Sequence, residues 1–171
     1  MNIGLLRDLK KRVGKENVTT DPVDLLAYSS DATRSYIVGR PDAVVLPRTV
    51  HHVADVLAYA FKRAIPVIPR GAGSGLAGGS TAVQGGILID MKRMNRVMEI
   101  NKGNFTAVVE AGVVLAHFHR RVEKERLFYP PDPQSMAVCT LGGNVATRAG
   151  GPRGVKYGCN HFSVLFSATS V

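Results

Sequence analysis

Five glycines stand among the nine residues 71–79, separated only by Leu76 and smaller side chains. Glycine has no Cβ, so several backbone N–H groups of such a segment can turn towards one ligand and approach it closely. Clusters of this kind bind anions, above all phosphate, and the hydroxyls of Ser74 and Ser80 are further donors. Residues 71–80, here called the glycine loop, are therefore predicted to bind phosphate after a buried strand. A flexible surface turn is the alternative interpretation.

The glycine loop matches the pattern GxGxxG between Gly73 and Gly78, but its surroundings do not fit a Rossmann site. In that site a helix follows the loop, because the helix N-terminus binds the pyrophosphate. Here the chain runs on through residues 81–85 into another apolar, strand-like segment. No Gly-Lys-Ser/Thr follows either, which excludes a Walker A loop.

A second group of small residues lies further along the chain and comprises Thr140, Gly142, Gly143, Gly150 and Gly151. A dinucleotide is too long to be enclosed by one loop. A second loop of small residues could therefore pass its backbone along the rest of such a cofactor. Taken alone, a turn-rich connection is the simpler interpretation of this segment.

Histidine and cysteine spacing does not indicate a metal site. Cys139 and Cys159 form no CxxC pattern, and we expect two free thiols. We expect all five histidines at the solvated surface; they are His51, His52, His117, His119 and His161. No residue of the chain is identified as catalytic.

The elements that must position these residues follow from the apolar periodicity. Helices are predicted over residues 3–13, 22–28, 50–61 and 114–127. Asp21 and Thr49 are the expected N-caps, and Gly14 is an expected helix end. Strands are predicted over residues 43–46, 65–69, 86–90, 97–100, 106–111 and 162–171. Strand, helix and strand over residues 43–69 form a βαβ unit, which implies parallel pairing.

Composition limits the classes of partner. The 171 residues suit one domain, and the net charge of +9 favours anionic ligands. Nucleic acid is not expected, because the basic residues are dispersed and tryptophan is absent. No apolar run is long enough for a membrane span and no secretory signal is evident, so we expect a cytoplasmic protein.

Four ordered motifs resemble the FAD-linked oxidases of the vanillyl-alcohol oxidase type. The similarity is strongest to the branch of the glycolate oxidase flavin subunit and D-lactate dehydrogenase. The motifs are residues 69–79, Pro131-Asp132-Pro133, residues 140–144, and Ala149-Gly150-Gly151 followed by Lys156-Tyr157-Gly158. Arg148 departs from the asparagine that usually stands at this place in the family, and residues 159–162 depart from it as well.

The resemblance implies an α+β, two-subdomain FAD-binding fold. One subdomain has a small parallel βαβ sheet, the other a mainly antiparallel sheet, and FAD lies between them. Residues 1–171 are then an FAD-binding domain. It comprises an N-terminal helical segment (1–40), a βαβ subdomain with the phosphate loop (41–85) and a truncated second subdomain (86–171). The family's substrate cap and catalytic residues lie in a C-terminal half that is absent from this sequence.

The resemblance also implies the cofactor contacts. The pyrophosphate would be bound by Pro69, Arg70, Gly71, Ala72, Gly73, Ser74, Gly75, Gly78 and Gly79. The flavin or adenosine would be lined by Pro131, Asp132, Thr140, Gly142, Gly143, Gly150, Tyr157 and Gly158. No histidine stands between Arg70 and Ser80, so FAD would bind non-covalently.

The implied function is the FAD-binding portion of an oxidoreductase that acts on a small 2-hydroxy acid of the glycolate or D-lactate type. Hydride would pass to flavin N5. Because the chain supplies no catalytic base, we expect it to be inactive without the missing half, and it could require a partner subunit or an oligomer. The alternative is a non-catalytic module that binds another phosphorylated ligand or a partner subunit.

Overall fold

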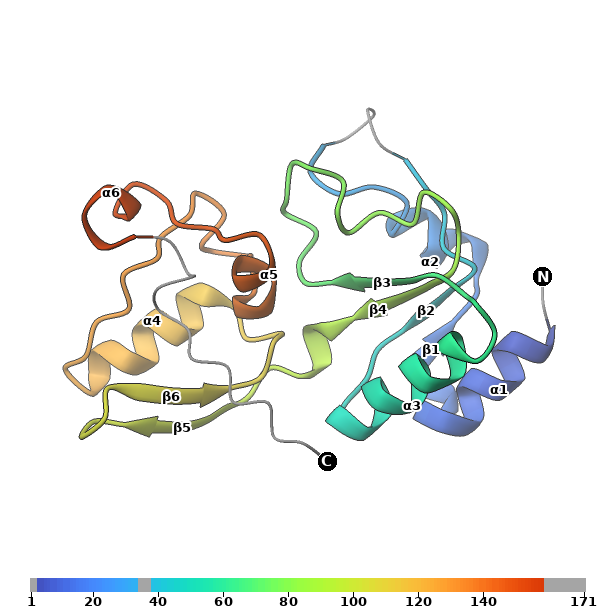
Figure 1. The fold of residues 1–171 in the computed structure, drawn as a ribbon, viewed down its shortest axis with the longest axis horizontal. Coiled ribbons are helices and arrows are strands. Elements are labelled where there is room, and N and C mark those ends of the chain that lie inside the picture. Colours follow the sequence, from blue (N-terminus) through green and yellow to red (C-terminus); the bar gives the residue numbers. More distant parts are fainter. Residues whose placement is uncertain (1–2, 34–37, 159–171) are drawn as a thin grey trace.

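The structure is a computed structural model that describes residues 3–33 and 38–158, which form two α+β subdomains side by side (Figure 1). The strands are β1 (Val18–Thr19), β2 (Ala43–Val45), β3 (Val67–Arg70), β4 (Ile87–Asp90), β5 (Val97–Asn101) and β6 (Thr106–Val109). The helices are α1 (Ile3–Val13), α2 (Pro22–Ala27), α3 (Val50–Phe61), α4 (Leu115–Lys124), α5 (Leu141–Ala146) and α6 (Gly154–Tyr157). Short 3-10 helices span Lys15–Asn17 and Met91–Arg93.

A four-stranded sheet of order β1-β2-β4-β3 forms the first subdomain. β2 and β3 both run parallel to β4, whereas β1 pairs antiparallel with β2. Every residue of β2 and β4 is buried, as expected of parallel strands that are covered on both faces. β3 is half-buried, so the strand before the glycine loop is less buried than predicted.

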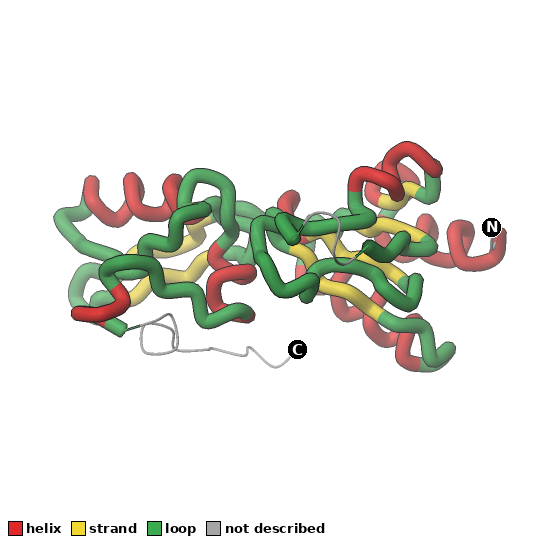
Figure 2. The backbone as a smooth tube through the Cα atoms, turned by 90° about the horizontal axis from the view of Figure 1, so that it is seen from above, coloured by secondary structure: helices red, strands yellow, loops and turns green. Residues whose placement is uncertain are grey.

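Helices cover both faces of this sheet (Figures 1 and 2). On one face, Leu9 of α1 and Val56 of α3 join Val45 in one core. On the other face, Leu25 of α2 packs with Val44. Neighbouring residues of β2 therefore point into opposite layers, as the alternation of side chains along a strand requires.

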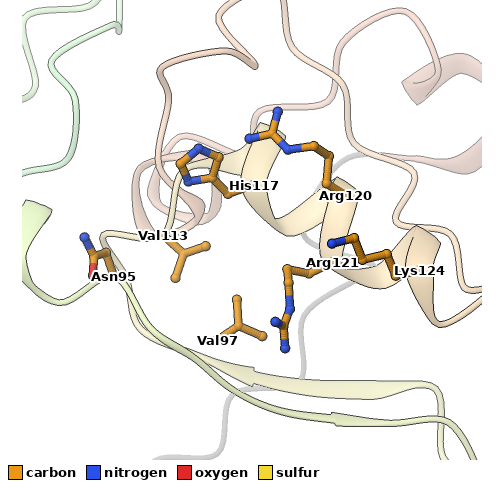
Figure 3. Close-up of a pocket in the computed structure, with 7 residues that line it drawn as sticks. All are labelled: Asn95, Val97, Val113, His117, Arg120, Arg121 and Lys124. Carbon is orange, nitrogen blue, oxygen red and sulfur yellow. The ribbon is translucent and has the colours of Figure 1, made fainter.

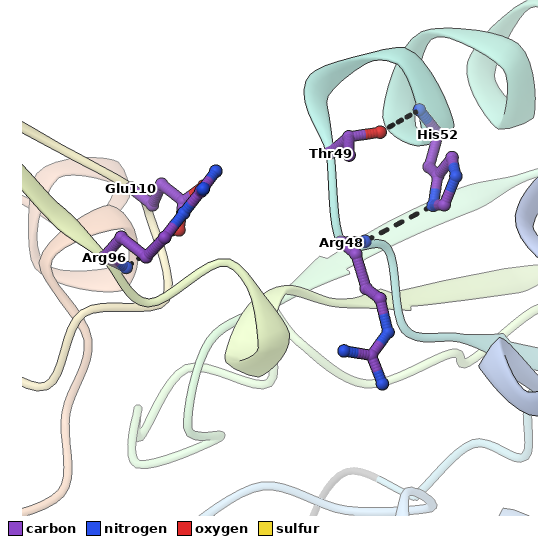
Figure 4. Close-up of polar contacts among 5 residues, drawn as sticks. All are labelled: Arg48, Thr49, His52, Arg96 and Glu110. Carbon is purple, nitrogen blue, oxygen red and sulfur yellow. Dashed lines mark hydrogen bonds and ion pairs between the residues drawn. The ribbon is translucent and has the colours of Figure 1, made fainter.

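Short-range sequence signals set the ends of these helices as predicted. The Asp21 carboxylate accepts a hydrogen bond from the Val23 N–H at 2.8 Å and caps α2. The Thr49 hydroxyl accepts from the His52 N–H at 3.2 Å and caps α3, while His52 Nδ1 accepts from the Arg48 N–H (Figure 4). α1 ends before Gly14, whose φ of 89° is accessible to glycine without strain.

The second subdomain is built on the antiparallel pair β5 and β6. α4 covers one face of this pair, where Phe118 and Val122 pack with Val109. Arg96 and Glu110 join the base of the hairpin through an ion pair of 2.7 Å (Figure 4). The hydrogen bond from Arg96 holds the pKa of Glu110 below its ordinary value.

The α+β class and the two kinds of sheet are confirmed, but two details of the prediction are wrong. The strands of the βαβ unit are not neighbours, because β4 lies between β2 and β3. A helix about 10 Å wide spans roughly two strand spacings of about 4.8 Å, so the crossover through α3 leaves room for one strand. The first sheet therefore extends to Asp90, beyond the boundary expected at residue 85.

The segment that contains Thr140, Gly142 and Gly143 was predicted as a loop, and this prediction is also wrong. Residues 141–146 form α5, capped by the Thr140 hydroxyl, which accepts from the Gly143 N–H at 3.3 Å. The sequence did not predict this helix, because two of its six residues are glycine, which is a poor helix former. The strand predicted over residues 162–171 lies outside the described residues.

Candidate functional site

The glycine loop leaves the sheet at the carboxyl end of β3. Parallel β2 and β4 end at the same edge, which is where ligands bind in open α/β sheets. Among the described residues, no backbone N–H of residues 71–77 donates to a backbone carbonyl. All of these residues are exposed or half-buried, and a Cβ at Gly75 or Gly79 would meet open space. These N–H groups therefore have no main-chain acceptor among the described residues and are available to an anion.

The side chain of Arg70 lies under the glycine loop and binds backbone carbonyls there. Its guanidinium donates to the carbonyl oxygens of Ser30 at 2.9 Å and Ser80 at 3.2 Å, and it lies 5.5 Å from the centre of the Tyr28 ring. A Cβ at Gly73 would overlap this guanidinium. Arg70 thus holds the two ends of the loop together, and its charge lies beneath the loop.

A cluster of polar side chains that sequence reasoning missed supports Arg70. The Tyr28 hydroxyl donates to the buried Asp90 carboxylate at 2.7 Å. The Lys92 ammonium lies 3.0 Å from the same carboxylate and donates to the Tyr28 oxygen at 2.8 Å. The sequence feature that could have predicted this cluster is Asp90, a single carboxylate at the end of the otherwise apolar β4.

Asp31 fixes the far end of the glycine loop. It is buried, which raises its pKa, but hydrogen bonds from Thr33 and from the Gly78 N–H outweigh burial and lower the pKa overall. Asp31 is therefore ionised at neutral pH. Because the Gly78 N–H is turned towards this carboxylate, it is not among the free donors of the loop.

Predicted site residues from distant parts of the sequence meet at Gly71. A Cβ on Gly71 would overlap the Thr140 hydroxyl oxygen and lie 3.7 Å from the Cα of Gly143. The start of the glycine loop therefore touches the N-terminus of α5. Gly142 holds α5 against the turn that follows β6, since its N–H donates to the Ala111 carbonyl at 2.8 Å.

A second group of predicted residues meets around Asp132. The Asp132 N–H donates to the Gly150 carbonyl at 2.9 Å, and the Asp132 carboxylate binds the guanidinium of Arg153 at 3.2 Å. Tyr157 packs against Phe128, with 5.6 Å between ring centres, and the guanidinium of Arg153 lies 5.1 Å from the centre of the same Phe128 ring. Pro69 and Ala72 are exposed, Ser74 and Gly158 are half-buried, and Pro131 is buried.

His119 is buried, with 7% of its surface exposed, so the expectation of a surface histidine is wrong here. It forms a hydrogen bond with the backbone of Pro131, where the carbonyl is the only polar group, and its ring lies 5.9 Å from that of Tyr129. Its Nε2 has no hydrogen-bond partner among the described residues. Burial lowers the pKa of His119.

The described residues contain neither a metal-binding cluster nor a membrane-spanning helix. Nowhere in residues 3–33 and 38–158 do three His, Cys, Asp or Glu side chains gather in a way that could hold a metal ion. No helix within the same residues has both the length and the apolar character needed to cross a membrane.

Known proteins resemble this chain over most of its length. A family model described as an FAD binding domain matches residues 41–170. Glycolate oxidase subunit GlcD of Bacillus subtilis is 40% identical over 165 residues, which are 94% of this chain and 35% of the relative. D-lactate dehydrogenase of Anaerostipes hadrus is 40% identical over 132 residues, 77% of this chain and 28% of the relative. The chain thus spans about a third of these relatives.

Solved structures give the same picture. One structure of alkyldihydroxyacetonephosphate synthase superposes with a TM-score of 0.85 at 26% identity, covering 95% of this chain and 32% of that one. A p-cresol methylhydroxylase superposes with a TM-score of 0.73 at 23% identity, covering 85% and 29%. The latter similarity shows the shared fold alone.

Proposed function

The chain belongs to the family of FAD-binding domains, and on that premise we propose that it is the FAD-binding part of an oxidoreductase acting on a small 2-hydroxy acid. FAD is its cofactor. Two relatives at 40% identity are named for glycolate and D-lactate, and a third, at 35%, for D-2-hydroxyglutarate. All three are 2-hydroxy acids, which supports this substrate class.

The observation that carries the proposal is the set of free N–H groups in residues 71–77. In our proposal these groups bind the FAD pyrophosphate, with the whole set of Pro69, Arg70, Gly71, Ala72, Gly73, Ser74, Gly75, Gly78 and Gly79 forming the site. Seven main-chain donors and a serine hydroxyl suit a group with two phosphates. Arg70 acts as a positioning residue, since both of its hydrogen bonds go to the chain itself.

The remaining predicted contacts would line the flavin and adenosine. They are Pro131, Asp132, Thr140, Gly142, Gly143, Gly150, Tyr157 and Gly158. Contact between Gly71 and Thr140 supports one continuous site, because it joins the glycine loop to this second set. Without a histidine in the loop, the proposed attachment is non-covalent.

When bound, FAD supplies the hydride acceptor, flavin N5, for oxidation of the hydroxyl-bearing carbon. The proposed part of this chain in that chemistry is to hold and orient the cofactor. No residue of this chain is proposed to bind the substrate carboxylate or to accept the hydroxyl proton. We retain a cytoplasmic location as part of the proposal.

A screen of ligands by thermal unfolding of the purified chain tests this function. A ligand at about 100 times its Kd stabilises a protein by roughly 2.7 kcal/mol, which raises the Tm by several degrees for a chain of this size. We expect this shift with FAD and no comparable shift with NAD or ATP. Stabilisation by ATP or NAD without FAD would support a non-catalytic module for another phosphorylated ligand instead.

A further inference from the structure

A pocket of about 380 Å³ lies between α4 and the start of β5 (Figure 3). Its floor is apolar and consists of Val97 and Val113. Its wall carries His117, Arg120, Arg121 and Lys124, and Asn95 stands at one end. None of these residues belongs to the set proposed to bind FAD.

The wall is one face of α4. Residues 117, 120, 121 and 124 are spaced by three or four positions and therefore project from the same side of the helix. No ion pair between described residues involves Arg120, Arg121 or Lys124. Glu125 feels the charge of Arg121, but its carboxylate is bound by Lys102 at 2.6 Å. Among the residues that the structure describes, the face thus holds three cations without an ion-paired carboxylate.

The length of this face indicates what could bind it. From His117 to Lys124 the helix rises by about 10 Å, which exceeds the size of one carboxylate or phosphate. Alternate side chains of an extended peptide are about 6.6 Å apart, so two or three acidic residues match the row. An exposed single ion pair contributes little, whereas several charges engaged together at an interface contribute more.

We propose that this face of α4, with the pocket beside it, docks an extended acidic segment of a partner protein. The apolar floor would receive an aliphatic part of that segment, and the cations would bind its carboxylates. The pocket lining has no phenylalanine, tyrosine or tryptophan on which nucleic-acid bases could stack. An acidic peptide therefore fits this surface better than a nucleic acid.

The test uses fluorescence anisotropy of a labelled peptide of alternating glutamate and leucine residues, titrated with the whole chain. The double variant Arg120→Glu/Lys124→Glu removes two cations of the row. Arg7→Glu/Lys11→Glu is the matched control, because it makes the same change at the same spacing on α1. Circular dichroism and FAD binding verify that both variants fold.

We expect the α4 variant to weaken peptide binding by roughly tenfold or more, and the α1 control by less than about twofold. A peptide with glutamine in place of glutamate should not bind. Equal losses in both variants, or no binding of the glutamate peptide, would overturn the proposal. Tighter binding of a DNA duplex of the same charge would overturn it as well, and so would displacement of the peptide by equimolar citrate.

Discussion

Arg70 and Gly71 hold the start of the glycine loop by different means. Arg70 donates to the carbonyl oxygens of Ser30 and Ser80, whereas Gly71 lets the backbone touch Thr140. The cluster of glycines was evident from the sequence. The partners of Arg70 were not, because Ser30 lies 40 positions away and only the folded chain brings it near.

Alanine substitutions at Gly71 and Gly75 test whether the contact between Gly71 and Thr140 matters for stability, because only Gly71 has a close neighbour. Gly71→Ala should destabilise the chain by about 1–3 kcal/mol, because the new methyl group overlaps the Thr140 hydroxyl. Gly75→Ala adds the same methyl group where nothing lies within 4 Å, and the expected change is about 1 kcal/mol or less. Urea unfolding without added FAD measures both, and equal losses would contradict the contact with Thr140.

His119 should make stability dependent on pH. Burial lowers its pKa in the folded chain below the ordinary 6.5, so the unfolded chain binds the proton first. Stability is then complete above about pH 6.5 and falls as the pH drops from there towards the folded pKa, by at most about 1.4 kcal/mol per pH unit.

Urea unfolding at pH 5.5 and 7.5 measures this dependence. His119→Gln should reduce the difference between the two pH values, because glutamine does not titrate. His117→Gln is the matched control on the same helix and should leave the difference unchanged, since His117 is exposed. A pH dependence that persists in full in His119→Gln would refute this role.

Helices and strands could be predicted where a capping residue or the spacing of apolar residues sets their position. The helix boundaries at Asp21, Thr49 and Gly14 are as predicted: α2 and α3 begin after the first two residues, and α1 ends before the third. Capping could be predicted because it involves atoms only a few positions apart in the sequence. α5 was missed, since its two glycines argue against a helix and its support comes from Thr140 and from the distant Ala111. The place of β4 was also not predictable, because strand order depends on pairing across the whole sheet.

The glycine loop as an element depends on Arg70. Arg70→Gln removes a charged donor from the carbonyls of Ser30 and Ser80, at a cost of about 1.5–3 kcal/mol. If the loop must be ordered to bind FAD, affinity should fall by roughly tenfold or more. FAD titration measures the loss, and faster limited proteolysis within residues 71–80 should accompany it. Unchanged affinity with unchanged proteolysis would show that Arg70 does not position the loop.

The two subdomains meet where the glycine loop reaches α5, so the proposed cofactor site draws on both (Figure 1). A cofactor site between two subdomains was expected only from the resemblance of four motifs to a known family. The spacing of residues along the sequence does not show which loops meet in the folded chain. The net charge of +9 now has two proposed uses, a bound dinucleotide and an acidic partner at α4. The net charge alone predicted anionic ligands, but it does not distinguish a dinucleotide from an acidic protein segment.

Calorimetric titration of the purified chain with FAD and with riboflavin tests the central claim most directly. Riboflavin has the flavin ring without phosphate, so it lacks the group that the N–H donors of residues 71–77 would bind. The account predicts one FAD site per chain and binding of riboflavin weaker by about 100-fold or more. Equal affinities for FAD and riboflavin, or no binding of FAD, would contradict it.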